Sequence, residues 1–260
     1  MLERVEAIQF IRDEIGGKTK PVVAAAEHQN GDVSEVVLKF ASACEMGTKS
    51  LSVEVIAACL AGVLGLPVPE PFVVDLSPEW RESLPPSVRM RVSEFDTVAF
   101  GSKLLWPQWP AWTAANRLSS PMIQTAAEIM AFDGFVENAD RRDGNPNCLV
   151  SGEKLRIIDH ELAFPRFLLL APKPWEVGGM QAFTQPGAHI FRRELLAKTI
   201  DLATIQHKWS SLQDGNIDAY GAAVPVEWYE EAFVADILNK IRQVRDNIGG
   251  CMAELDRILQ

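Results

Sequence analysis

The chain contains the polar segment Asn138-Ala-Asp-Arg-Arg-Asp-Gly-Asn-Pro-Asn147, and a second segment, Ile157-Ile-Asp-His-Glu161, follows shortly after it. These segments hold an acid at Asp140, an amide at Asn145 and a second acid at Asp159. Either Asp alone would be interpreted as a turn residue, because Asp and Asn favour loops by hydrogen bonding to their own backbone. The three together, after a predicted helix and around a predicted hairpin, favour a site that binds a metal-bound nucleoside triphosphate and activates a hydroxyl group beside it.

Each of the three side chains has its own predicted role. A carboxylate within reach of an acceptor hydroxyl can orient it and accept its proton, so Asp140 is the candidate catalytic base. Magnesium takes a few oxygen ligands from protein and the rest from phosphate and water. The amide oxygen of Asn145 and the carboxylate of Asp159 meet that demand. They are the candidate metal ligands, and ATP with Mg²⁺ is the expected cofactor pair.

Lys39 ends the apolar run at 36–38. A lysine at a strand end is commonly a solvated charge, but in a kinase a lysine there pairs with the α- and β-phosphates and is held by a helix glutamate. Glu54, on the next predicted helix, is the matching acid, and Glu45 is a weaker rival in a less regular segment. Lys39 and Glu54 are therefore candidate catalytic residues, provided that Asp140 has its predicted role.

A glycine-containing turn comes earlier in the chain, at Gly16, Gly17, Lys18 and Thr19. It is not a Walker motif, because the required glycine is replaced by Arg12 and because a helix, not a strand, is predicted before it. Two interpretations stay open. The turn either lies at the edge of a nucleotide cleft with its N–H groups facing phosphate, or it only ends the preceding helix. In the first case these four residues and Lys39 bind the nucleotide.

The composition limits the classes of function. The chain has 260 residues, enough for one large domain or two closely packed lobes, and its 47% hydrophobic and 23% charged residues are the balance of a globular protein. A formal charge of −10 argues against general binding to nucleic acid or anionic membranes, because both need a basic surface. Sparse cysteines, and the lack of a signal-peptide core or an apolar run of membrane length, predict a soluble cytoplasmic protein. The histidines lack zinc-ligand spacing, and no Gly-x-Ser-x-Gly elbow of a hydrolase occurs.

Periodicity and turn residues divide the chain into a strand-rich first part and a helix-rich second part. Strands are predicted at 21–26, 33–40, 71–76 and 97–105, with a hairpin turn at 30–32 and a surface excursion around 85–86. Helices are predicted at 2–15, 50–64, 119–138, 191–212, 226–247 and 250–259, and a short hairpin at 147–158. We therefore predict an α+β fold of two lobes: an N-terminal lobe at 1–105 with a nucleotide-binding sheet and helix, and a helical C-terminal lobe at 106–260 with the catalytic and metal-binding loops.

Three tryptophans lie at the expected lobe junction, in Trp106-Pro-Gln-Trp109-Pro-Ala-Trp112. The prolines exclude a regular helix there. Large aromatic residues usually serve burial first, so the rings are expected to pack over the edge of the core. A binding surface for a protein partner is the second interpretation, because tryptophan is enriched at interface hot spots.

With Asp140, Asn145 and Asp159 in place, the chain resembles the HipA-like kinase domains, a group related to the bacterial HipA toxin kinases. Residues 140–147 resemble the group's Asp-Arg-His-x-x-Asn-Pro-Asn segment, and the other matches are Ile158-Asp-His-Glu161, Leu64-Gly-Leu-Pro-Val-Pro69 and Val37-Leu-Lys39. The matches span about residues 16–165. Phosphatidylinositol kinases share the Asp-Arg-His-x-x-Asn pattern, so this motif alone does not choose between relatives.

The resemblance implies a bilobal protein-kinase-like fold with a strand-rich N-terminal lobe and a mainly helical C-terminal lobe. It implies Asp140 as catalytic base, Asn145 and Asp159 as magnesium ligands, Lys39 as phosphate anchor and Glu54 as the ion-pair partner of that lysine. Arg142 stands where the group usually has histidine, which bears on loop geometry or catalysis. Neither a toxin–antitoxin role nor the identity of the phosphate acceptor follows from the resemblance.

The leading hypothesis is an ATP- and magnesium-dependent phosphotransferase that acts on serine or threonine hydroxyls of a protein. The first alternative is a pseudokinase that senses nucleotide or binds a partner, which Arg142 and the tryptophans of 106–112 favour. The second is a small-molecule or lipid kinase, although the absence of a basic surface excess counts against a lipid substrate. The sequence leaves open the acceptor, the oligomeric state and any antitoxin-like partner.

Overall fold

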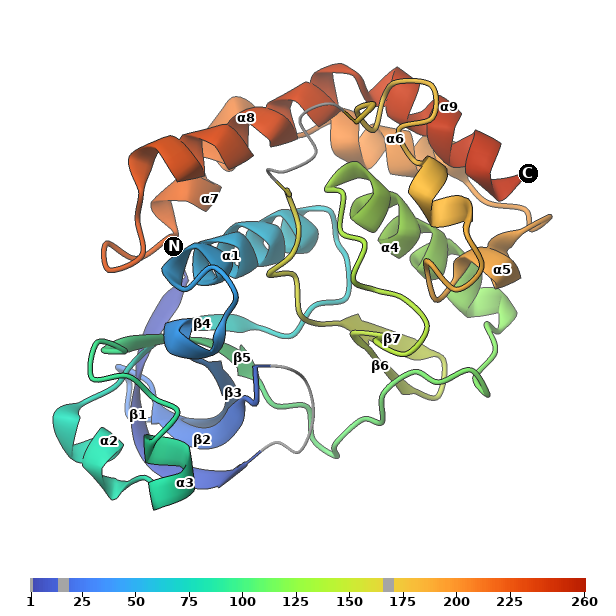
Figure 1. Cartoon of the computed structure of the whole chain (residues 1–260). Helices are drawn as coiled ribbons and strands as arrows, with labels where there is room; N and C mark the ends of the chain where they lie inside the picture. The colour runs from blue at the N-terminus through green and yellow to red at the C-terminus, as the bar shows by residue number, and fades with distance from the viewer. Residues whose placement is uncertain (1, 14–18, 166–170) are drawn as a thin grey trace.

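Five strands from the first part of the chain close into a barrel (Figure 1). The structure is a computed structural model that describes residues 2–13, 19–165 and 171–260. Their order around the barrel is β1-β2-β3-β5-β4, and β4 returns to β1 as a parallel neighbour while the other pairs are antiparallel. Alternate side chains fill the interior because successive strand residues face opposite sides. The strands are β1 (Glu3–Asp13), β2 (Val22–Glu27), β3 (Val33–Lys39), β4 (Pro71–Asp75) and β5 (Val98–Lys103).

The β2–β3 hairpin and its turn are confirmed. His28 N donates a hydrogen bond to Asp32 O at 2.8 Å, and Gly31 adopts the left-handed backbone conformation with φ 86°. Glycine takes that conformation without a steric penalty, which is why the turn forms at this position.

The helix predicted at 2–15 is wrong, because residues 3–13 form the strand β1. Val5 and Ala7 alternate into the barrel, whereas Ile8 and Ile11 are 47% and 37% exposed, and register shifts between Ala7 and Gln9 and between Phe10 and Arg12 interrupt the alternation. Pairing with β2 on one side and β4 on the other supplies backbone hydrogen bonds that the local sequence pattern does not reveal. Tertiary pairing therefore overrides the helical spacing.

The excursion expected between β4 and β5 is more than a surface loop. It contains two short helices, α2 (Pro78–Ser83) and α3 (Pro86–Arg89). The hydroxyl of Ser77 caps α2 by accepting a hydrogen bond from Trp80 N at 3.1 Å. The segment then buries Trp80, Leu84 and Val88 in the barrel core. It acts as a cover for one end of the barrel.

The second part of the chain is helical apart from the predicted hairpin, which is confirmed as β6 (Cys148–Ser151) and β7 (Lys154–Ile157). Besides α2 and α3, the described residues form the helices α1 (Thr48–Val63), α4 (Ile123–Phe135), α5 (Arg192–Leu195), α6 (Leu202–Ser210), α7 (Asp214–Ala222), α8 (Glu231–Asp246) and α9 (Ile248–Leu259), with 3₁₀ turns at Ala41–Ala43, Ser120–Met122 and Gln181–Thr184. No helix in the described part of the chain combines the length and apolar character needed to cross a membrane.

The helix predicted at 191–212 is wrong in its length, because it is divided into α5 and α6. Asp201 caps the second of them by accepting a hydrogen bond from Thr204 N at 3.0 Å, and such a cap marks a new helix start. Helix α7 escaped prediction because its sequence, with two glycines and a weak apolar stripe, has low helix propensity. It forms where it packs against α8 and α1.

Helix α1 lies between the barrel and the later helices (Figure 1). Its side chains are buried almost all round, and they belong to the same apolar cluster as α4, α6, α8 and α9. The interior of the barrel forms a second cluster. Val73 and Phe100 on the outside of the barrel belong to the first cluster, so α1 packs against both the barrel and the later helices. This fixes the position of any side chain that α1 presents between them.

Glu254 ties α9 to the segment at 178–180. Its carboxylate accepts hydrogen bonds from Arg257 Nη2 at 2.7 Å, Gly178 N at 3.1 Å and Met180 N at 3.3 Å. The bond from Arg257, aided by the two backbone N–H groups, lowers the pKa of Glu254 from 4.5 to about 2. A lowered folded-state pKa stabilises the fold above the unfolded value, and this contribution disappears as the pH falls through the folded value.

We therefore expect Glu254→Gln to reduce the free energy of unfolding by a constant amount above about pH 5, and by less and less as the pH falls from about 4.5 towards 2. Urea unfolding of both proteins over this pH range measures the difference. Glu153→Gln, an exposed change in the β6–β7 turn, is the control and should show no such convergence. A Glu254→Gln deficit that stays the same at every pH would contradict the account.

Candidate active site

One pocket of about 990 Å³ is lined by residues of the barrel, α1, the loop after α4 and the β6–β7 hairpin. All predicted site residues that the structure describes line this pocket: Thr19, Lys39, Glu54, Asp140, Asn145 and Asp159. Gly16, Gly17 and Lys18 lie outside the described residues. The structure thus brings together side chains that are distant in the sequence, such as Lys39 and Asp159, which are 120 positions apart.

Lys39 is the central charge of the pocket. It is the last residue of β3, and its Nζ forms an ion pair with Glu54 Oε1 of α1 and a second one with Asp159 Oδ1 at 2.7 Å. Burial alone would lower the pKa of Lys39, but the carboxylates of Glu54 and Asp159 outweigh it and raise the pKa above its usual value. Lys39 is therefore charged at neutral pH, and a charged amine is a strong hydrogen-bond donor to anions.

Glu54 is 1% exposed, and it has a second contact besides Lys39. His160 Nδ1 lies 3.5 Å from its Oε2, so the carboxylate is held from two sides. Burial would raise the pKa of Glu54, but Lys39 and the hydrogen bond with His160 outweigh burial and hold the pKa below its usual range. The rival Glu45 also lines the pocket, but Glu54 makes the ion pair with Lys39.

Glu161 is a pocket residue for which sequence reasoning assigned no role. It is buried, and it raises the negative charge beside Lys39. Its own pKa is raised, first because it is buried and also because Asp159 is close, although Lys39 acts against both. The sequence signal that could have identified Glu161 was its position two residues after Asp159. Acidic residues therefore surround the lysine on several sides.

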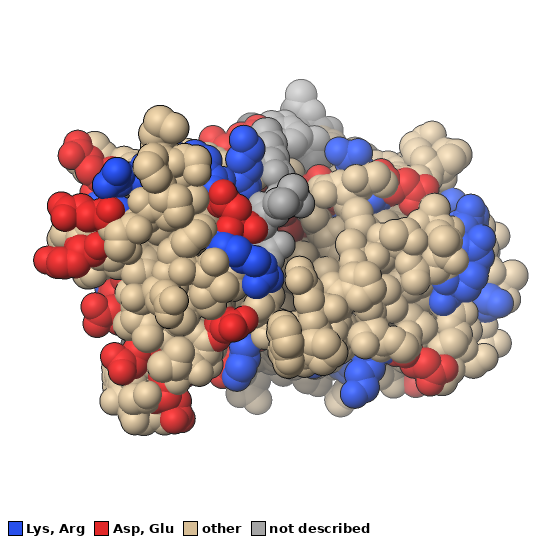
Figure 2. Space-filling model, turned by 90° about the horizontal axis from the view of Figure 1, so that it is seen from below, with Lys and Arg blue, Asp and Glu red and all other residues tan. Residues whose placement is uncertain are grey.

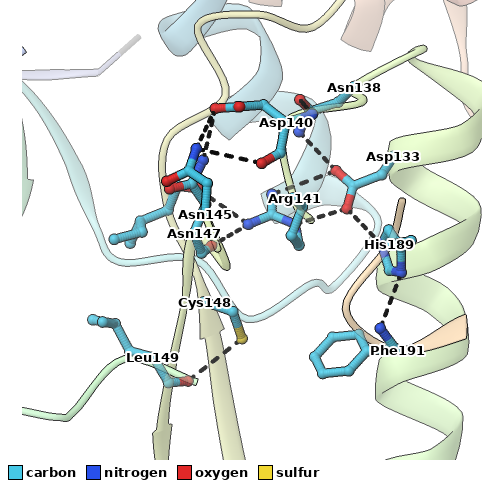
Figure 3. Close-up of polar contacts among 11 residues, drawn as sticks. Asp133, Asn138, Asp140, Arg141, Asn145, Asn147, Cys148, Leu149, His189 and Phe191 are labelled. Atoms are coloured by element: carbon cyan, nitrogen blue, oxygen red, sulfur yellow. Dashed lines mark hydrogen bonds and ion pairs between the residues drawn. The ribbon is translucent and has the colours of Figure 1, made fainter. Parts of the chain in front are cut away.

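Asp140 is fixed by two amide side chains from its own loop (Figure 3). Asn145 Nδ2 and Asn147 Nδ2 both donate to its Oδ2, at 2.8 and 3.0 Å. The backbone N–H of Asp140 is in turn held by Asn138 Oδ1 at 3.3 Å. Both amide donors point at one carboxylate oxygen, Oδ2, and neither of them occupies Oδ1. Because Asn145 uses its nitrogen for Asp140, its carbonyl oxygen is the group that can bind a metal ion.

Asp159 follows β7 with a left-handed backbone, φ 61°. Asn147 shares this conformation at φ 42°, and Ile158 N donates to Asn147 O at 3.0 Å, which joins the two loops. Asp and Asn tolerate left-handed φ better than most residues, but the conformation is still costly and is found where the surroundings enforce it. Here it turns the Asp159 carboxylate towards Lys39.

A buried carboxylate, Asp133 of α4, supports the Asp140 loop through Asn138 and Arg141 (Figure 3). Asp133 Oδ2 accepts from Arg141 Nε at 2.7 Å and contacts His189 Nε2 at 3.1 Å, and Asp133 Oδ1 accepts from Asn138 Nδ2 at 2.8 Å. Asp133, Arg141 and His189 have no exposed side-chain surface. Burial would raise the pKa of Asp133, but Arg141 and His189 outweigh it and lower the pKa.

Sequence reasoning missed this supporting network. An acid inside the apolar run of α4 was the available signal, because a buried carboxylate requires a partner. Arg141 also donates to Asn147 O, and to Ile158 O at 3.2 Å, so one buried guanidinium connects the helix, the Asp140 loop and the end of β7. The geometry of the pocket therefore depends on groups that do not line it.

The tryptophans of 106–112 divide between burial and exposure. Trp112 is buried, and its ring meets Phe191 edge-on at a centroid distance of 5.2 Å. Trp109 lines the pocket with the Arg156 guanidinium 5.8 Å from its ring centroid. Trp106 is 82% exposed, so packing over the core does not account for it. The predicted partner surface at 106–112 stays a prediction.

The residues of the pocket fit a magnesium ion only if phosphate and water supply the remaining oxygen atoms around it. In the described ranges no cluster of three or more His, Cys, Asp or Glu side chains is placed to hold a metal by itself. Asp159 and the carbonyl oxygen of Asn145 supply one charged and one neutral oxygen. That donor set suits Mg²⁺ bound together with phosphate and water.

Figure 2 shows acidic side chains gathered mainly over the barrel side of the face seen from below. The described basic residues that line the pocket are Lys39, Lys103 and Arg142, and each lies beside a carboxylate. This arrangement suits a localised phosphate group.

A family model described as HipA-like kinase matches residues 8–254 of the chain. The Helicobacter pylori proinflammatory kinase CtkA is similar in fold over 100% of both chains, with a TM-score of 0.57 and 10% sequence identity. The Golgi casein kinase matches 97% of this chain and 72% of its own at 12% identity, with a TM-score of 0.48. Hydra Fam20 with sugar matches 95% and 86% at 12% identity, with a TM-score of 0.49. The last two scores are too low to establish a common fold. No match was found among curated proteins.

Proposed function

This chain belongs to the HipA-like kinase family, and from that premise we propose that it uses ATP and Mg²⁺ to phosphorylate serine or threonine hydroxyls of a protein. The observation that carries the proposal is the meeting of Lys39, Glu54 and Asp159 with the Asp140–Asn145 loop in one pocket. A family of kinases accounts for phosphate transfer. The residue roles and the protein acceptor are our inference.

Each residue has a role that its contacts support. Lys39, oriented by Glu54, binds the phosphates of ATP, and Thr19 borders the same space. Asp140 Oδ1 accepts the proton of the acceptor hydroxyl as its oxygen attacks the γ-phosphorus, while the bond to the β-phosphate oxygen breaks. Asn145 and Asp159 would hold Mg²⁺, which neutralises charge on the phosphates when bound. To serve as a ligand, Asp159 would give up its present contact with Lys39.

We also propose that the chain works as two lobes, 1–105 and 106–260, with the nucleotide between them. The separate apolar cluster inside the barrel supports this division. Helix α1 belongs by sequence to the first lobe but packs with the helices of the second. If the two lobes move relative to each other, α1 must therefore either move together with the second lobe or slide along it.

A transfer assay tests the function. ATP labelled at the γ-phosphate is incubated with the protein, Mg²⁺ and three classes of acceptor: proteins of a lysate, small alcohols and phosphoinositides. Where the label is found in protein, its stability to base identifies the hydroxyl. Phosphotyrosine is stable to base, whereas phosphoserine is labile. Label in alcohols or lipids alone would replace the protein acceptor. ATP binding without transfer to any class would overturn the proposed enzyme.

Asp159→Asn tests the metal role. ATP should raise the free energy of unfolding of the unaltered protein by about 2.7 kcal/mol at 100 times its Kd, and by less when EDTA removes the metal. The variant should lose this dependence on metal, because it lacks the charged ligand. Thermal unfolding with ATP, in Mg²⁺ or in EDTA, is the measurement, and Asp218→Asn on α7 is the control. Equal metal dependence in Asp159→Asn would exclude Asp159 as a ligand.

A further inference from the structure

Arg142 lies at the rim of the pocket with its side chain 55% exposed, whereas its neighbour Arg141 is fully buried. The two arginines therefore serve different purposes. Arg141 is committed to Asp133 and to two backbone carbonyls. Arg142 faces the space in which a substrate would bind.

The backbone of Arg142 is held tightly although its side chain is open. Its N–H donates to Asp140 O and to Asn145 O, both at 3.1 Å, and Asn145 N donates back to Arg142 O at 2.9 Å. The residue thus sits inside the turn between the predicted base and the predicted metal ligand. Its Cα position is fixed relative to both.

The guanidinium of Arg142 lies beside the reacting end of Asp140, with Nε 4.0 Å from Oδ1. Among the described residues, Asp140 is the carboxylate that forms an ion pair with Arg142. An ion pair with one half-exposed member contributes little to stability, so fold maintenance does not explain the position. The guanidinium keeps most of its donors for another anion.

We propose that Arg142 is a catalytic residue that donates hydrogen bonds to the γ-phosphoryl group during transfer, an inference that rests on the proposed function. The hydroxyl held by Asp140 must touch the γ-phosphorus, so the phosphoryl oxygens come within reach of a guanidinium that lies 4.0 Å from the same carboxylate. In transfer, negative charge is spread over three equatorial oxygens, and a planar fork of N–H donors matches two of them. Arg142 itself neither gains nor loses a proton.

The test uses Arg142→Gln, Arg142→Lys and Arg142→Ala. We expect Arg142→Gln to lower kcat by about 100-fold or more, the effect of removing one strong donor to a developing charge. The Kd for ATP, measured by calorimetry, should change by less than about 3-fold, because the contact strengthens only in the transition state. Arg142→Lys should retain part of kcat through its charge, and added guanidinium ion should restore part of the activity of Arg142→Ala.

The readouts are ADP release with water as acceptor and label transfer to the acceptor found in the assay above. Arg117→Gln, an exposed change at a side chain that donates to the neighbouring carbonyls at 114 and 116, is the control. Unaltered kcat in Arg142→Gln, with an active parent protein, overturns this inference alone. A raised KM for the acceptor at constant kcat also overturns it, since Arg142 would then bind the acceptor. A parent protein that transfers nothing overturns the proposed function as well.

Discussion

Replacing Asp140 by Asn is expected to lower phosphate transfer by about 10²- to 10⁴-fold, the usual contribution of a general base. The variant keeps the size and the hydrogen-bonded setting of the side chain, but an amide cannot accept the proton of the acceptor. Because Lys39 and Asp159 are untouched, the Kd for ATP should change little. Label transfer measured together with ATP calorimetry separates the two quantities.

The same loop offers a matched control for Asp140→Asn. Asp143 is an exposed acid three residues further on, and its backbone N–H bonds Gly187 O at 2.9 Å. Asp143→Asn makes the same chemical change in the same loop and should leave transfer near the parent rate. If Asp140→Asn transferred phosphate as well as the parent protein, the assigned base would be wrong.

Replacing Asp133 by Ala is expected to reduce the free energy of unfolding by about 3–5 kcal/mol, the cost of leaving one member of a buried ion pair without its partner. Arg141 would remain in the interior with its charge uncompensated, and His189 and Asn138 would each lose a hydrogen bond. Denaturant unfolding measures this loss. A surviving folded fraction should also show reduced transfer, because the Asp140 loop loses its support.

Asp218→Ala is the control for Asp133→Ala, because Asp218 forms an exposed pair with Arg242. The same chemical change at the surface should cost only about 0–1 kcal/mol. Equal costs for the two variants would show that the buried network does not support the fold.

The site was more predictable from the sequence than the elements that carry it. Asp140, Asn145 and Asp159 could be singled out because an acid, an amide and a second acid at those spacings meet a specific chemical demand. Lys39 and Glu54 could be paired because a strand-end lysine and a helix acid are a known combination. The structure brings all five into one pocket.

What could not be predicted depends on contacts that are distant in sequence. Residues 3–13 have helical spacing, and only the neighbouring strands β2 and β4 make them a strand. The role of Asp133 depends on His189, which follows 56 positions later, and no local pattern relates them. The left-handed φ of Asp159 accompanies its ion pair with Lys39, which lies 120 positions earlier in the sequence. Local sequence reports chemistry and propensity, whereas tertiary contacts decide these three features.

The position of the bound metal tests the central claim most directly. Crystals of the protein grown with Mn²⁺ and a non-hydrolysable ATP analogue would locate the cation by its anomalous scattering. The account predicts a peak between the Asp159 carboxylate and the Asn145 amide oxygen, with the triphosphate at Lys39 and its last phosphate facing Asp140. A nucleotide bound elsewhere, or a cation that contacts neither Asp159 nor Asn145, would contradict it.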